Sequence, residues 1–152
     1  RERDMATNLK ELKSLLKKLD IICQEAEGEV LVLDVRTERY QNRDGEKILT
    51  LALRPKNFHL FTFYPLLQTD AHHDALIHAC LVIQSKAKMV RFVFDAKTSE
   101  LRCEVRFSLK GAKLTKNQLH RCISGMVESV DRFYPVIQRA AQEEVVAFEG
   151  VE

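Results

Sequence analysis

The sequence predicts an α+β domain in which one antiparallel β-sheet of about five strands carries helices packed on one face. Three segments repeat apolar residues every three or four positions, as amphipathic helices do. Five other segments are short apolar or alternating runs, as strands are, and they follow one another through short turns. Because strands grouped in this way form antiparallel sheets, the expected order is helix, three strands, helix, two strands, helix.

The composition is that of an ordinary globular domain. The chain has 152 residues, with 24 Lys and Arg against 22 Asp and Glu, and a formal net charge of +2. This length predicts a single domain over 1–152, with flexible ends at 1–7 and 147–152. The charge balance argues against a polybasic or acidic tail. Since no apolar stretch is long enough for a membrane span or a signal peptide, we expect a cytoplasmic protein with four reduced thiols, Cys23, Cys80, Cys103 and Cys122.

The first half predicts one helix followed by an antiparallel meander. Leucines at three- and four-residue steps predict a helix over 8–25, which begins with a capping box of Asn8 and Glu11. A β-branched run, a return strand after an Asp-Gly turn and an aromatic segment bounded by prolines predict strands over 29–40, 46–54 and 58–64.

The second half predicts a helix, a hairpin and a long final helix. The helix covers 71–86, and the hairpin joins strands over 89–95 and 100–110. A second capping box, Thr115 to Gln118, opens the last helix, which Pro135 is expected to end or kink, although 136–146 can continue it. The second hairpin strand alternates, which predicts one buried and one wet face; its apolar side holds Leu101, Cys103, Val105, Phe107 and Leu109, and its polar side Arg102, Glu104, Arg106, Ser108 and Lys110.

The second half also resembles a known family. The helix DALIHACLVIQSK, the hairpin MVRFVFDAKTSELRCEVRFSLK and the helix that runs through Asp131, Phe133 and Tyr134 are similar in layout to the YbjN family of bacterial proteins, sometimes described as sensory transduction regulators. The layout is also similar to the wider type III secretion chaperone-like fold. The resemblance covers about 8–141, and it departs at Cys80 and Ile83, where family members often carry Asn. It implies an α+β fold, dimerisation and a binding role rather than catalysis.

The third predicted strand is apolar on both faces, which favours a binding surface. In an extended strand Phe58 and Tyr64 face one side, while Phe61 and Phe63 face the other. A sheet covered by helices on one face should be wet on the other, so the excess apolar surface needs a returning helix or a partner. The leading hypothesis is therefore a non-enzymatic protein-binding or chaperone-like module without a cofactor, acting as a homodimer that binds a protein or peptide client. The predicted partner-binding residues are Phe58, Leu60, Phe61, Phe63, Tyr64, Leu119, Met126 and Phe133.

An alternative hypothesis is a regulator that binds nucleic acid or another polyanion. Its candidate anion-binding residues are Arg91, Arg102, Arg106 and Lys110, which share the predicted wet face of the hairpin. Glu104 lies among these cations, and the face offers few aromatic side chains for base stacking. An ordinary solvated face is therefore the favoured interpretation.

A second alternative is an enzyme of unrecognised type. Its polar candidates are Asp70, His72, His73, Asp74 and His78, around the start of the second helix. No HEXXH pair, phosphate-binding glycine loop or serine-hydrolase motif is present, and His78 and Cys80 are two residues apart on a helix, so they face different directions. We therefore expect no catalytic residue and no metal.

Overall fold

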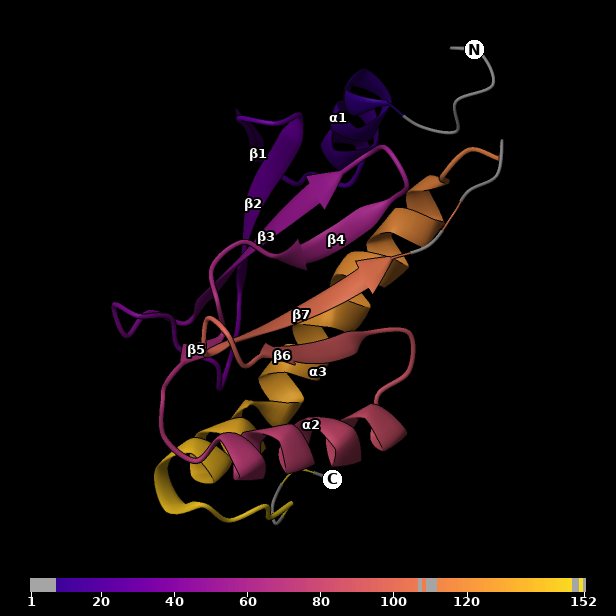
Figure 1. The fold of residues 1–152 in the computed structure, drawn as a ribbon. Coiled ribbons are helices and arrows are strands. Elements are labelled where there is room, and N and C mark those ends of the chain that lie inside the picture. The colour runs from indigo at the N-terminus through magenta and orange to yellow at the C-terminus, as the bar shows by residue number, and fades with distance from the viewer. Residues whose placement is uncertain (1–7, 107, 109–111, 149–150, 152) are drawn as a thin grey trace.

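A computed structural model describes residues 8–106, 108, 112–148 and 151, and confirms the predicted α+β class (Figure 1). Over these residues it contains three helices, which are α1 (Leu9–Lys18), α2 (His73–Lys86) and α3 (Lys116–Glu143). The same residues form one seven-stranded sheet, made of β1 (Cys23–Ala26), β2 (Val30–Arg36), β3 (Ile48–Arg54), β4 (His59–Thr62), β5 (Leu67–Gln68), β6 (Arg91–Asp95) and β7 (Glu100–Arg106).

All the strand pairs are antiparallel. The sheet runs β1-β2-β3-β4-β7-β5, and β6 pairs with β7 as well. β4 pairs with the second half of β7, where Leu60 lies opposite Val105, and β5 pairs with the first half, where Leu67 lies opposite Leu101. β6 therefore occupies the other side of β7, at the far edge of the sheet from β1.

The three helices cover one face of the sheet, so the core lies between the two layers. α3 crosses behind β7, and α2 lies beside β6 (Figure 1). Leu51, Cys103 and Leu101 point toward the helices and are fully buried, together with Met126 of α3. The other face, called the open face here, carries alternate side chains of the same strands, and the predicted alternation along β7 is confirmed over its described residues.

The structure corrects the first predicted helix and adds two strands. α1 ends at Lys18 rather than near 25, because Asp20 adopts a left-handed conformation at φ 60°. The residues that follow turn back as β1, whose Cys23 lies opposite Leu33 of β2. Ile22 and Cys23 continue the helical spacing of the preceding leucines, which suggested a longer helix. In the structure the backbone groups of β1 instead form hydrogen bonds with the edge of β2. β5 has two residues and is too short to show any period in the sequence.

The last helix continues past Pro135, which is one of the two expected outcomes. Pro135 lies inside α3, and the helix continues to Glu143 as the apolar pattern allowed. The side chains after the proline, Val136 and Ile137, are fully buried, and their burial outweighs the lost backbone hydrogen bond. After α3, Val151 is buried and its carbonyl accepts a hydrogen bond from Arg132, while the flexibility of 147–152 stays a prediction. The predictions that fall on 1–7, Phe107 and Leu109 lie outside the described residues, as does Lys110.

Candidate functional site

Most of the predicted partner-binding residues belong to the chain's own core. Phe58, Leu60, Leu119 and Met126 are fully buried, and Phe133 is 1% exposed. The reason is that the sheet and the helix layer pack against each other through these side chains. These five side chains are therefore not available to a partner, and the prediction is wrong for them.

The three remaining aromatic residues of that prediction lie at the open face or its border. Phe61 stacks on the His59 ring at a centroid distance of 4.5 Å, and the Arg54 guanidinium lies 4.7 Å from its centre. Phe63 and Tyr64 make an edge-to-face pair at 4.9 Å, and Tyr64 is well exposed. For Phe61, Phe63 and Tyr64 a role in partner binding stays a prediction.

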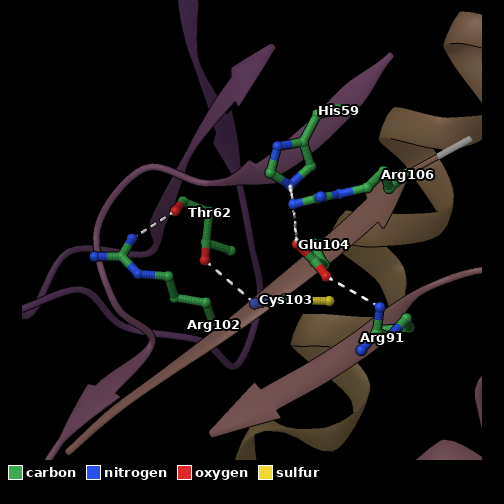
Figure 2. A network of polar contacts seen from close by, with 7 residues as sticks. All are labelled: His59, Thr62, Arg91, Arg102, Cys103, Glu104 and Arg106. Atoms are coloured by element: carbon green, nitrogen blue, oxygen red, sulfur yellow. Dashed lines mark hydrogen bonds and ion pairs between the residues drawn. The ribbon is translucent and has the colours of Figure 1, made fainter. Parts of the chain in front are cut away.

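The predicted basic face is a cluster of charges centred on Glu104 (Figure 2). The Glu104 carboxylate lies 2.9 Å from His59 Nε2, 3.4 Å from an Arg106 nitrogen and 3.4 Å from an Arg91 nitrogen. Burial lowers the pKa of His59, and the nearby charges of Arg106 and Arg54 add to this, against the opposing hydrogen bond to Glu104. One carboxylate thus neutralises much of the charge of two arginines.

Arg102 is also engaged within the chain. Its guanidinium donates hydrogen bonds to the carbonyl oxygens of Thr62 and Phe63, at 2.9 and 3.0 Å, and to Glu100 at 3.2 Å. Figure 2 shows this side chain reaching from β7 to the end of β4. Three of the four residues proposed for anion binding therefore already have carboxylate partners, which weakens the polyanion alternative.

The polar residues before α2 form a structural contact rather than a catalytic triad. The Ser99 hydroxyl donates to Asp70 at 2.8 Å, and His73 Nε2 lies 3.1 Å from the Thr69 carbonyl oxygen and 3.3 Å from the Ser99 hydroxyl. A carbonyl only accepts, so Nε2 carries the hydrogen and has no lone pair to take a proton from Ser99. In this tautomer His73 does not act as a base toward the Ser99 hydroxyl.

The other members of this set do not converge with them. His72 lies 3.7 Å from Glu144, and Asp74 and His78 are exposed. Within the part of the chain that the structure describes, no group of three or more His, Cys, Asp or Glu residues is placed to hold a metal ion.

The cysteines are free thiols in apolar surroundings. Burial raises the pKa of Cys80 to about 11, and it also raises the pKa of Cys103. Because the thiolate is the reactive form, neither thiol is a nucleophile at neutral pH.

The structure also contains a groove that the sequence did not predict. It has a volume of about 860 Å³ and lies between the turn after α1, the end of β2 and the first half of α3. We call it the β2 groove; its apolar lining is Leu19, Ile21, Ile22, Val32, Leu33, Val35, Ile123 and Val127. Ile22 is 87% exposed, more than the other large apolar side chains of the described residues. In the predicted helix over 8–25, Ile22 would lie at the edge of the apolar stripe that packs on the core. The groove was therefore not expected from the sequence.

The β2 groove runs beside an open strand edge. β1 pairs with β2 only from Val30 to Leu33. The next three residues, Asp34 to Arg36, pair with β3 on one side, and among the described residues no strand pairs with them on the other. Exposed backbone donors and acceptors of this kind are a template for an added strand.

Polar groups border the groove and carry charges of both signs. Carboxylates come from Asp20, Asp34 and Glu128, while Arg36 supplies one cation and His120 a titratable ring. Thr50 donates a 2.6 Å hydrogen bond to Asp34 and holds its carboxylate at the rim. The groove therefore combines apolar side chains with a border that carries three carboxylates and one guanidinium group.

The antiparallel sheet with three helices on one face defines this chain as an α+β protein, and its fold is YbjN-like. The chain is similar to a solved structure, the crystal structure of YbjN from E. coli, described as a "putative transcription regulator". The TM-score is 0.59 and the identity 14%, over 91% of this chain and 94% of that one. No family model matches the sequence, and no curated protein matches it. Among the described residues, no helix is both long and apolar enough to cross a bilayer.

Proposed function

We propose that this chain is a non-enzymatic protein-binding module that holds an extended peptide in the β2 groove. The observation that carries the proposal is the open backbone edge of Asp34–Arg36 beside a groove of about 860 Å³ that is lined in part by apolar side chains. Neither feature alone is unusual, but together they offer both backbone hydrogen bonds and pockets for side chains. The YbjN-like fold is compatible with such a role.

The peptide would bind as an additional strand. Its backbone pairs with Asp34–Arg36, so that β2 gains a neighbour where β1 has ended. Alternate side chains then point into the groove, against Ile22, Val35 and Val127. Burying one large apolar side chain is worth about 1.5–3 kcal/mol, so two or three anchors contribute about 3–9 kcal/mol before the cost of ordering the peptide, and with the backbone hydrogen bonds they favour weak, reversible binding.

A displayed library of random twelve-residue peptides tests the proposal. We expect selected peptides to alternate apolar and polar residues and to bind the chain with micromolar affinity. Ile22→Asp should weaken binding at least tenfold, because it places a charge in the apolar channel. Val145→Asp is the matched control, since Val145 is an exposed apolar residue that belongs neither to the groove nor to α2 or β6.

The proposal fails if the selected peptides bind Ile22→Asp as well as the unaltered chain. It fails equally if no peptide binds above background while the protein is folded, as judged by circular dichroism.

We further propose that the module acts as a homodimer in a bacterial cytoplasm. The exposed apolar residues at the opposite edge of the molecule, on α2 and β6, support self-association. Sedimentation at micromolar concentration tests it, and a strict monomer at every concentration up to about 1 mM would contradict it.

A further inference from the structure

We propose that the extended peptide in the β2 groove runs antiparallel to β2 and carries an acidic, an apolar and a basic residue in that order at consecutive positions. The acidic side chain pairs with Arg36, the apolar one packs on Val35 and the basic one pairs with Asp34. This inference rests on the proposed peptide binding and deepens it, because it names the chemistry of the peptide. It does not depend on the proposed homodimer.

The backbone of β2 presents its open edge at two residues. The Thr37 backbone N–H donates to the Lys47 carbonyl oxygen at 3.0 Å, so the Thr37 amide points to the side of β3. Because backbone groups alternate in direction along a strand, those of Val35 also point to β3, while those of Asp34 and Arg36 point to the open edge. An added strand therefore forms its hydrogen bonds with these two residues and places one residue opposite Val35 between them.

The lining of the groove reaches both faces of the sheet. Side chains alternate along β2, so Val35 packs toward the core and lines the groove together with Ile123 and Val127 of α3. Asp34 and Arg36 point to the open face, and they line the same groove. A strand at this edge touches both sets of side chains, whereas a compact ligand beside the helices touches only the first set.

An antiparallel direction fits the surrounding sheet. β1 is antiparallel to β2 along the same edge, and it begins at Cys23, opposite Leu33. A peptide that pairs with the next residues of β2 lies in line with β1, and antiparallel pairing is slightly more stable per residue than parallel pairing. Read from its N-terminus, the peptide then meets Arg36, Val35 and Asp34 in turn.

The two open-face side chains carry opposite charges, which set the order of charges in the peptide. Directly opposite side chains of an antiparallel pair are neighbours, and opposite charges there stabilise the pairing. Arg36 and Asp34 are both exposed, and Thr50 holds the Asp34 carboxylate through a hydrogen bond. Asp20 and Glu128 come from the turn after α1 and from α3, so they border the apolar position of the peptide rather than these two. The peptide therefore has its acid first and its base third.

The displayed library of twelve-residue peptides tests the inference directly. We expect the selected peptides to contain the order acid, apolar, base more often than the order base, apolar, acid. In one selected peptide the triplet is then changed from Glu-Leu-Lys to Lys-Leu-Glu, which keeps the composition. The reversed peptide should bind about tenfold more weakly at low salt, because two attractive pairs become two repulsive ones, and the difference should shrink at about 0.5 M salt.

A charge exchange in the chain provides the reciprocal test. The double variant Asp34→Lys with Arg36→Glu should prefer the Lys-Leu-Glu peptide, and thermal unfolding shows whether the variant is folded. The matched control is Arg43→Glu with Asp44→Lys, which makes the same exchange at exposed positions of the loop after β2, outside the groove. This control should keep the preference for Glu-Leu-Lys. The peptide reversal needs no variant and decides the matter even if the exchanged chain fails to fold.

Equal binding of the two peptides by the unaltered chain would overturn the inference and leave the proposed peptide groove in place. A preference of the unaltered chain for Lys-Leu-Glu would also overturn it, because the peptide would then run parallel to β2. A folded double variant that still prefers Glu-Leu-Lys would show that the charges are recognised elsewhere, and so would a control that loses this preference. If the library yields no peptide at all, the proposed function fails, and this inference fails with it.

Discussion

The Asp131 carboxylate on α3 accepts a 2.6 Å hydrogen bond from the backbone N–H of Arg39, in the loop between β2 and β3. The same carboxylate accepts bonds of 2.8 Å from the backbone N–H groups of Glu38 and Tyr40. A single side chain thus accepts hydrogen bonds from three consecutive backbone N–H groups of the loop, which lie outside the strand pairs. The contact ties the loop to the helix layer and directs the Tyr40 ring onto Tyr134, at a centroid distance of 4.8 Å.

Replacing Asp131 by Asn should lower the free energy of unfolding by about 1–2 kcal/mol. The amide keeps one oxygen but presents an N–H₂ group to at least one of the three backbone donors, which then loses its partner. Urea unfolding at pH 7 measures the change. Asp44→Asn is a matched control at the exposed tip of the same loop, and it should change stability by less than about 0.5 kcal/mol.

The same contact makes stability depend on pH. Burial alone would raise the pKa of Asp131, but the hydrogen bonds from Tyr40, Arg39 and Glu38 outweigh it and lower the pKa below its usual value. A carboxylate whose pKa is lower in the folded state stabilises the fold above its unfolded pKa, about 3.9, and loses this effect as the pH falls through the folded pKa.

The stability difference between the unaltered chain and Asp131→Asn should therefore be full at pH 6–7 and shrink below about pH 4. Urea titrations at pH 7, 5 and 3 measure it. An equal difference at all three pH values would contradict the assignment.

Glu104→Gln should turn the open face into a stronger anion-binding surface. The substitution removes the carboxylate that pairs Arg91 and Arg106, so both guanidinium groups become available to phosphate or sulfate groups. Retention on immobilised heparin should rise, with elution at higher salt than for the unaltered chain. The matched variant Glu100→Gln, which frees only Arg102, should shift elution less, because Arg102 keeps its two carbonyl partners.

Removing the Glu104 carboxylate should also move the His59 pKa further down. The bond to Glu104 opposes the lowering caused by burial, and its loss leaves burial and the two arginines unopposed. An NMR titration of the ring measures the shift. A rise of the His59 pKa in Glu104→Gln would show that the hydrogen bond does not act as described.

Gly125→Ala should stabilise the protein by about 0.5–1 kcal/mol, because glycine in the middle of α3 is a poor helix former. A methyl group at this position would come within 2.7 Å of the terminal methyl carbon of Met89. That carbon ends a flexible, half-exposed side chain, so it can move aside at little cost. The midpoint of thermal unfolding should rise, and a fall of several degrees would mean that Met89 is fixed over the helix.

Local patterns predicted several elements correctly because the interactions that form them are close in the sequence. Both expected capping boxes are present, Asn8 with Glu11 and Thr115 with Gln118. The alternation along β7 correctly assigned Cys103 to the core and Arg102 to the open face. The α+β class follows from the same local periods, since each helix or strand must cover its apolar side with another layer.

The sites were predicted less well because they depend on which distant segments meet. The stripe from Leu119 to Phe133 is apolar enough to bind a partner, but the chain's own sheet covers it. On one side β2 pairs with β1 only as far as Leu33, whereas on the other side it pairs with β3 as far as Arg36. No sequence pattern within β2 shows where the pairing with β1 stops, so the open edge of β2 could not be predicted.

By itself the sequence determined the fold class, the helix caps, the faces of the amphipathic segments and the lack of a recognisable catalytic motif, because these depend on spacing along the chain. The tertiary structure alone decided that Glu104 neutralises two arginines, that Gln84 covers the edge of β6 and that a groove lies beside β2. Each of these features either joins residues that are far apart in the sequence or leaves part of a strand without a neighbour. The order in which the strands and helices are connected decides which segments meet, and the composition of a single segment does not.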